Sequence, residues 1–179
     1  KLNVDGVHKR GGEYIESELQ AAVDNDDING QVVDEVISRG QNYKHWLFFC
    51  TGVAHAEHIA EDLNDMNITA ACVTGKTPAA ERASIIKRFK SGEIKALTNA
   101  NVLTTGFDFP NIDLIAMLRP TMSPSLYMQM AGRGLRPKGH TDHCLVLDFA
   151  GNVEAHGPIT RVRPPHKSGS GGEAPVKVC

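Results

Sequence analysis

Residues 45–73 read HWLFFCTGVAHAEHIAEDLNDMNITAACV, and this stretch decides the fold class. The apolar run at 45–50 is typical of a buried strand, and a second short apolar run follows at 69–73. Between them, the spacing of Ile59, Leu63 and Met66 predicts a helix over 53–66 with one apolar face. Strand, helix and strand in this order make a βαβ unit, which places the two strands parallel in one sheet.

The same alternation continues along the chain. We expect further helices over 16–23, 28–39, 79–90 and 125–130, and further strands over 94–98, 114–118 and 144–148. The pattern predicts an α/β domain of three layers, helices on both faces of a central, mainly parallel sheet. In such a sheet functional residues gather where the strands end, at their carboxyl edge.

Composition divides the chain into three parts. We expect residues 1–40 to be an N-terminal extension or linker, 41–157 the α/β domain, and 158–179, which are rich in Pro, Ser and Gly, a flexible tail. The 179 residues are 41% hydrophobic, enough for a real core, and the net charge of −2 gives no bulk attraction to nucleic acid. Basic residues are in surplus between Thr74 and Lys95, which suits either a phosphate contact or a solvated helix face.

Gly75-Lys76-Thr77 has the letters that end a phosphate-binding P-loop. That loop needs another glycine six positions before the lysine, and Ala70 stands there. With one glycine, the backbone cradle around the phosphates is not expected to form. The stretch is therefore predicted to be a turn between a strand and a helix without the P-loop function.

Two other segments have the composition of a phosphate site. LTTGFDFP (103–110) is a glycine loop with one carboxylate, Asp108, and QMAGRGLR (129–136) carries Arg133 and Arg136. Arginines three apart point to the same side of a helical turn, and the guanidinium fork matches phosphate oxygens. The glycines beside them would let a phosphate approach closely. A capped helix end with two surface arginines explains the second segment equally well.

Four segments resemble, in their order and spacing, motifs of the second RecA-like domain of superfamily 2 helicases. They are residues 46–51, 74–82, 99–110 and 129–136. The resemblance covers about residues 40–150. Within this superfamily the sequence looks closest to bacterial RadD-type DNA-repair helicases, on the basis of segments 11–15, 119–124, 127–134 and 144–150. DEAD-box RNA helicases carry glutamine at the position of Ala79, often threonine at the position of Ala100, and histidine at the position of Gln129. These differences favour a DNA-directed branch.

The resemblance implies a role for each matching residue. Arg133 and Arg136 would act as arginine fingers on the γ-phosphate of ATP held by another domain, and Gln129 would position that phosphate or the attacking water. Gly106 and Asp108 would lie near the nucleotide ribose or these arginines. Contacts with the nucleic-acid backbone are implied for Thr51, Gly52, Thr74, Gly75, Arg82, Asn99 and Asn101. For Arg82, bracing the loop is the alternative role.

The sequence contains no Walker A lysine and no DEAD or DEAH stretch. The resemblance therefore implies that ATP and Mg²⁺ are held mainly by a first RecA-like domain of the same protein, and that this fragment alone is inactive. DNA, single-stranded or branched, and single-stranded-DNA-binding protein are the other implied partners. Two alternatives stay open: a non-catalytic module that binds nucleic acid or protein, and a double-strand translocase that does not unwind.

Cysteines and histidines complete the sequence reading. The four cysteines, Cys50, Cys72, Cys144 and Cys179, lie far apart and are expected to be free thiols. No signal peptide or transmembrane run is visible, so a reducing cytoplasmic setting is expected, and the resemblance to RadD-type helicases implies a bacterial one. Residues 140–144 are dense in ligand types, and a pair of histidines lies at 55 and 58. A closed zinc site needs four nitrogen or sulfur ligands. The resemblance to RadD-type helicases implies that the 158–179 tail leads towards a cysteine-rich zinc-binding region, but Cys179 alone cannot make a site, so we expect no metal in this chain.

Overall fold

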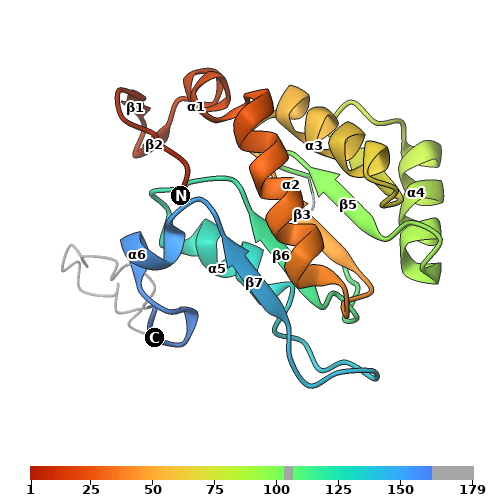
Figure 1. The fold of residues 1–179 in the computed structure, drawn as a ribbon. Coiled ribbons are helices and arrows are strands. Elements are labelled where there is room, and N and C mark those ends of the chain that lie inside the picture. Colours follow the sequence, from red (N-terminus) through yellow and green to blue (C-terminus); the bar gives the residue numbers. More distant parts are fainter. Residues whose placement is uncertain (103–106, 163–179) are drawn as a thin grey trace, which may run out of the picture.

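The computed structural model describes residues 1–102 and 107–162 of the chain. Five strands form one parallel sheet in the order β4-β5-β3-β6-β7 (Figure 1). Their bounds are β3 Trp46–Phe49, β4 Ala70–Val73, β5 Ala96–Asn99, β6 Leu114–Met117 and β7 Leu145–Asp148. The predicted α/β fold with a parallel sheet is confirmed.

Helices cover both faces of the sheet. They are α1 Glu16–Val23, α2 Asp26–Gly40, α3 Val53–Asp65, α4 Ala79–Ser91, α5 Pro124–Gly132 and α6 Asn152–His156, with a short 3-10 helix at Ile159–Arg161. Figure 1 shows α2 crossing in front of the sheet and α5 behind it. In the described residues, none of the helices is long and apolar enough to cross a membrane.

Strand β3 shows why the core has two halves. Its four side chains alternate between the faces, and each is at most 2% exposed. Trp46 and Phe48 pack with α2 and α3, whereas Leu47 and Phe49 pack with α4 and α5. Burying a side chain of this size stabilises the fold by roughly 1.5–3 kcal/mol. A strand buried on both faces has a continuous apolar sequence, which is why 45–50 marks the centre of the sheet.

Helix α2 belongs to the α/β core. Its Val33 and Val36 are buried in the same cluster as Trp46. Where α2 ends, a Cβ on Gly40 would lie 2.5 Å from the Trp46 ring, so glycine is needed for the helix to approach β3. Helix α2 therefore packs in the same core as β3.

The N-terminal residues contain a hairpin that the sequence reasoning missed, formed by β1 (Lys9–Arg10) and β2 (Glu13–Tyr14). Its Glu13 carboxylate accepts hydrogen bonds from the Thr121 hydroxyl and, at 2.9 Å, from the Met122 amide. Burial acts to raise the pKa of Glu13, but these hydrogen bonds outweigh it and leave the pKa lowered. The hairpin is thus tied to the segment between β6 and α5.

The cysteines within the described residues, Cys50, Cys72 and Cys144, are free thiols, as expected. Cys179 lies outside the described residues.

Candidate functional site

The two arginines follow the end of α5. The Ser123 hydroxyl caps the start of this helix by accepting from the Leu126 amide at 3.2 Å, and Pro124 suits the first helical turn. The helix ends at Gly132, and Arg133 Nη1 donates to the carbonyl oxygen of Phe107 at 2.5 Å. Burial lowers the pKa of the half-buried Arg133 guanidinium from its ordinary value.

Arg136 forms an ion pair with Asp108. The side chains are 41% and 76% exposed, so both charges face solvent. Residues 107 and 108 therefore hold both guanidinium groups, one through a carbonyl and the other through a carboxylate. Gly106, expected beside them, lies outside the described residues.

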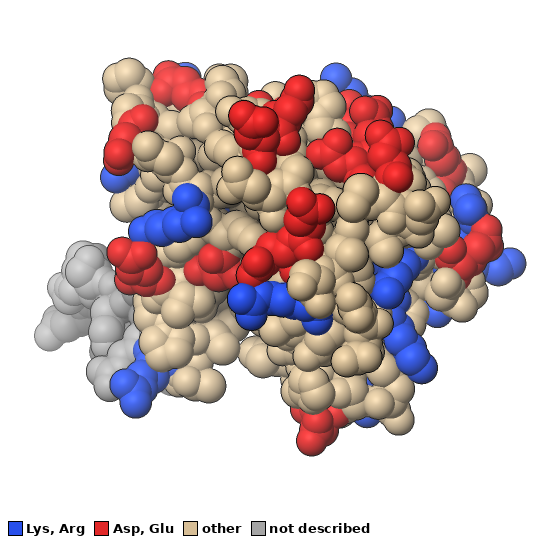
Figure 2. All heavy atoms as spheres, in the orientation of Figure 1, with Lys and Arg blue, Asp and Glu red and all other residues tan. Residues whose placement is uncertain are grey.

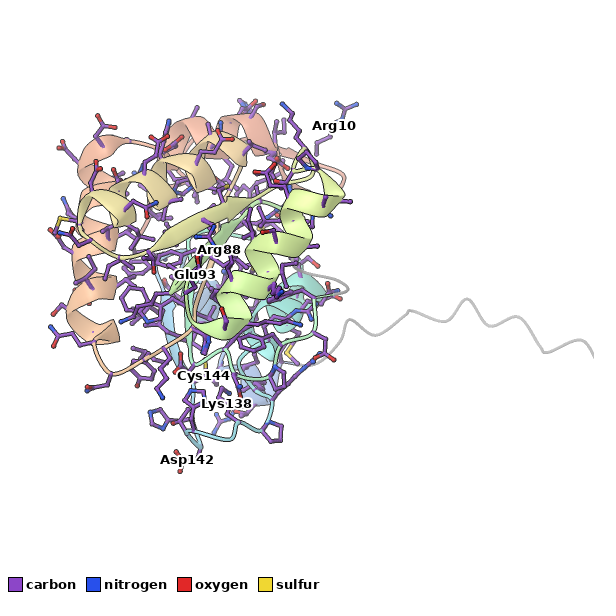
Figure 3. All side chains as sticks on the ribbon, turned by 90° about the vertical axis from the view of Figure 1, so that its right-hand side faces the viewer. Arg10, Arg88, Glu93, Lys138, Asp142 and Cys144 are labelled. Carbon is purple, nitrogen blue, oxygen red and sulfur yellow. The ribbon has the colours of Figure 1, made fainter. Side chains whose placement is uncertain are left out.

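Gly134 and Lys138 fix the turn that carries the arginines. A Cβ on Gly134 would lie 2.4 Å from Cys144 Sγ and 3.0 Å from Ile115 Cδ1, so the turn packs directly on the sheet. Lys138 Nζ donates to the carbonyls of Gly134 at 2.5 Å and Arg136 at 2.9 Å, and Figure 3 shows Lys138 close to Cys144. The space beside the Gly134 Cα is therefore filled by the protein itself.

Gln129 lies one helical turn before Arg133 on α5. It is exposed, and its Nε2 lies 3.4 Å from Ser125 Oγ. Residues four apart on a helix share a face, so Gln129 presents its amide on the side where Arg133 follows.

The turn after β4 is braced from within. Arg82 Nη2 donates to the carbonyls of Thr74 at 3.0 Å and Thr77 at 3.2 Å, and Thr77 Oγ1 accepts from the Thr74 amide at 3.0 Å. Thr74 is buried, whereas Gly75 is exposed and a Cβ there would meet nothing within 4 Å. The geometry gives Arg82 the bracing role and leaves the backbone at Gly75 open to a ligand.

The turn after β3 is largely covered. Thr51 is buried, and its hydroxyl lies 2.8 Å from His55 Nδ1. Burial lowers the pKa of His55 to about 4. A Cβ on Gly52 would lie 1.9 Å from Gln20 Oε1, so α1 packs closely on this turn.

The turn after β5 has one buried and one exposed asparagine. Asn99 is buried and donates to the carbonyl of Phe48 at 2.7 Å. Asn101 is exposed in the left-handed region, with φ 61°, and its Nδ2 donates to Glu16 Oε2 at 2.8 Å. Among the residues expected to contact nucleic acid, Gly75 and Asn101 are therefore the exposed ones at the ends of β4 and β5.

The ligand-type residues of the 140–144 run do not converge. His140 Nε2 lies 2.8 Å from Asp113 Oδ2, whereas His143 lies 3.2 Å from the Tyr43 hydroxyl and 2.9 Å from Asp142. Figure 3 shows Asp142 at the outer tip of this loop. Burial raises the pKa of the Cys144 thiol to about 12.

The parallel five-stranded sheet with helices on both faces defines the class as a RecA-like α/β domain. Solved structures share this fold: the C-terminal domain of the DEAD-box protein Dbp5 has a TM-score of 0.57 at 20% identity, covering 70% of each chain. An HsdR-like fragment of a type I restriction enzyme from Vibrio vulnificus YJ016 has a TM-score of 0.67 at 22% identity, covering 84% of this chain and 31% of that one.

The family model described as "Helicase conserved C-terminal domain" matches residues 29–138, and the chain belongs to this family, within superfamily 2. ATP-dependent helicase IRC3 of Saccharomyces cerevisiae is 34% identical over 153 residues, which are 84% of this chain and 22% of that protein. The mitochondrial ATP-dependent helicase irc3 of Schizosaccharomyces pombe is 37% identical over 117 residues, 65% of this chain and 19% of that protein. The chain thus spans about a fifth of the length of these relatives.

Proposed function

We propose that this chain is the second motor domain of an ATP-dependent superfamily 2 DNA helicase or translocase. The observation that carries the proposal is the pair of guanidinium groups held by residues 107 and 108, Arg133 by the Phe107 carbonyl and Arg136 by Asp108. Positive groups oriented before the reaction stabilise charge that develops in the transition state, because little reorganisation is then needed.

ATP and Mg²⁺ are held mainly by a first RecA-like domain of the same protein. When the two domains close, Arg133 and Arg136 reach the γ-phosphate, and Gln129 orients that phosphate or the attacking water. Asp108 holds Arg136 while the domains are apart. Because this ion pair is open to solvent, a phosphate can take the place of the carboxylate at small cost.

Nucleic acid contacts the carboxyl edge of the sheet through backbone phosphates and therefore without reading base sequence. The open amide backbone at Gly75 and the exposed Asn101 supply contacts, and Arg82 keeps the Gly75 turn in shape. Thr51, Thr74 and Asn99 are buried and act by fixing their turns, as does Gly52 where α1 packs on it. Figure 2 shows acidic side chains gathered over the region of α1, α2 and α3, a surface that repels DNA.

DNA rather than RNA as the substrate, a role in repair and a bacterial cytoplasmic setting are supported by the resemblance to RadD-type helicases in the sequence. The same resemblance supports single-stranded-DNA-binding protein as a partner. A non-catalytic interaction module is less well supported, since such a module has no need of the arginine pair or of Gln129.

The test is ATP hydrolysis by the protein that contains this chain. We expect Arg133→Ala and Arg136→Ala each to lower the rate by roughly 10³–10⁵, the range known for arginine fingers. Arg39→Ala is the matched control, because Arg39 is also in an exposed ion pair, with Glu35, but on α2. Hydrolysis at the wild-type rate in both arginine variants would refute the proposal.

Two further assays sort the alternatives. Nucleic-acid binding that weakens with added salt is expected for phosphate contacts. Separation of a DNA fork indicates a helicase, and displacement of a triplex strand without fork separation indicates a double-strand translocase.

A further inference from the structure

Three metal-ligand side chains meet at the amino edge of the sheet, opposite to the edge where the Gly75 and Asn101 turns lie. His45 precedes β3, Asp113 precedes β6, and His140 lies in the loop before β7. One nitrogen or carboxylate oxygen from each lies within 4.8 Å of the others. The strands β3, β6 and β7 are neighbours in the sheet, which brings these distant residues together.

His45 carries the argument. It is 8% exposed, and neither ring nitrogen has a hydrogen-bond partner within the described residues. The edges of Phe89 and Phe109 enclose the ring, with centroids at 5.5 and 4.9 Å. A buried polar group without a partner is costly, so such a group in a native protein points to something that completes it.

Asp113 is held as an oriented carboxylate. It is 1% exposed, and its Oδ1 accepts the amides of His45 at 2.8 Å and Lys44 at 3.1 Å. Its Oδ2 lies 2.8 Å from His140 Nε2 and 2.9 Å from the Lys44 amide. Backbone donors of this kind fix the orientation of a ligating carboxylate.

We propose that His45, Asp113 and His140 bind a divalent transition-metal ion, with Zn²⁺ as the best match. Two imidazoles and one carboxylate are ligands that zinc accepts, at about 2.0–2.2 Å, and water would complete a tetrahedron. Donor atoms around one such ion lie roughly 3.3 Å apart, as these bond lengths require. The His45 and His140 rings must therefore move slightly closer to the Asp113 carboxylate when the ion binds. The ion then replaces the hydrogen bond between His140 and Asp113.

The residues around the site determine how an ion can reach it and how tightly the ion binds. A cavity of about 440 Å³ reaches His45 from solvent, and the His140 side chain is 24% exposed. Lys44, Lys90 and Lys95 also line that cavity, and their positive charge weakens the binding of a cation. We therefore expect weaker binding than in a closed zinc site of four protein ligands.

This site differs from the set weighed in the sequence, His140, His143 and Cys144. His143 has other partners, and the thiol of Cys144 stays protonated because burial raises its pKa to about 12. The inference is independent of the proposed function. It differs from the sequence expectation that this chain binds no metal, and a bound ion would link the starts of β3 and β6 to the loop after the arginines.

Calorimetric titration of the tag-free chain with Zn²⁺ is the test. We expect one ion per chain, and a loss of affinity in His45→Phe and His140→Gln that exceeds the roughly 10–100-fold typical of outer partners of a metal site. His45→Phe keeps the aromatic packing, and His140→Gln keeps a donor for Asp113. His143→Gln is the matched control, because His143 lies on the same loop and contacts none of the three, and it should bind as the wild type does.

Two more readouts keep the proposal refutable if a variant is unstable. Zn²⁺ should raise the unfolding temperature of the wild type and of His143→Gln but not of the two ligand variants. Co²⁺ should give the visible spectrum of a four-coordinate site without a thiolate charge-transfer band. No saturable binding, equal affinity in the ligand variants, or a thiolate band from Cys144 or Cys179 would each overturn the proposal.

Discussion

Gly134 offers a sharp test of how the arginine turn is built, because Gly132, two residues earlier, provides a matched control. A Cβ at Gly134 would lie 2.4 Å from Cys144 Sγ and 3.0 Å from Ile115 Cδ1, whereas a Cβ at Gly132 would meet nothing within 4 Å. Neither glycine has a positive φ, so the difference between them is one of space alone.

We expect Gly134→Ala to lower the free energy of unfolding by about 1–3 kcal/mol, the usual cost of overpacking a filled site. Gly132→Ala, in the last residue of α5, should be neutral or stabilising by up to roughly 1 kcal/mol, because alanine loses less entropy in a helix. Cys144→Ala removes the closest atom, so the double variant with Gly134→Ala should lose about 0.5–2 kcal/mol less than the sum of the single losses.

Urea unfolding followed by the fluorescence of Trp46, the single tryptophan, measures these differences. If the turn positions the arginines as proposed, ATP hydrolysis by the full protein falls in Gly134→Ala and stays unchanged in Gly132→Ala. Equal stability of the two glycine variants, or a Gly134→Ala variant as stable as the wild type, would refute the packing argument.

Three other predictions follow from the same geometry. Asp108→Asn and Arg136→Gln should each lower the free energy of unfolding by no more than about 1 kcal/mol, and a double-mutant cycle should give a similarly small coupling, because the ion pair is exposed. The pKa of His55 is about 4 in the folded state against 6.5 in the unfolded state, so up to roughly 3 kcal/mol of stability should be lost as the pH falls from about 6.5 to about 4. In His55→Gln the free energy of unfolding should depend less on pH across this range, and a pH dependence equal to that of the wild type would contradict the assignment. Arg82→Ala removes the donor to the carbonyls of Thr74 and Thr77 and should speed hydrogen exchange of the amides in that turn, an effect that a surface arginine without a bracing role would not have.

The α/β part of the fold was predictable because its apolar residues recur at the spacings typical of helices and strands. The expected strand at 45–50 and helix at 53–66 became β3 (Trp46–Phe49) and α3 (Val53–Asp65), and the shift at the ends is the usual fraying of such boundaries. The β1–β2 hairpin was missed because its strands have two residues each and depend on the distant contact between Glu13 and Thr121. The packing of α2 on β3 was not predicted, because the sequence pattern of a helix does not specify which strand its buried face contacts.

The candidate site was predictable where residues lie close in sequence and hidden where the sheet brings them together. Arg133 and Arg136 were identified together from their spacing, but the partner of Arg133 is a backbone carbonyl, which leaves no signature in side-chain types. The cluster of His45, Asp113 and His140 joins residues 68 and 27 positions apart, so it required the strand order β3-β6-β7. Sequence spacing alone drew attention to the neighbouring run at 140–144 instead.

The central claim is that this domain supplies charge to an ATP molecule that another domain holds. Single-turnover hydrolysis by the full protein, measured beside the dissociation constant for ATP, tests it most directly. The account predicts that Arg133→Ala lowers the rate constant of hydrolysis by roughly 10³–10⁵ and changes ATP affinity far less, with Arg133→Lys restoring only part of the rate because the fork is lost. A rate constant within a few fold of the wild type, with Arg136 also replaced, would contradict it.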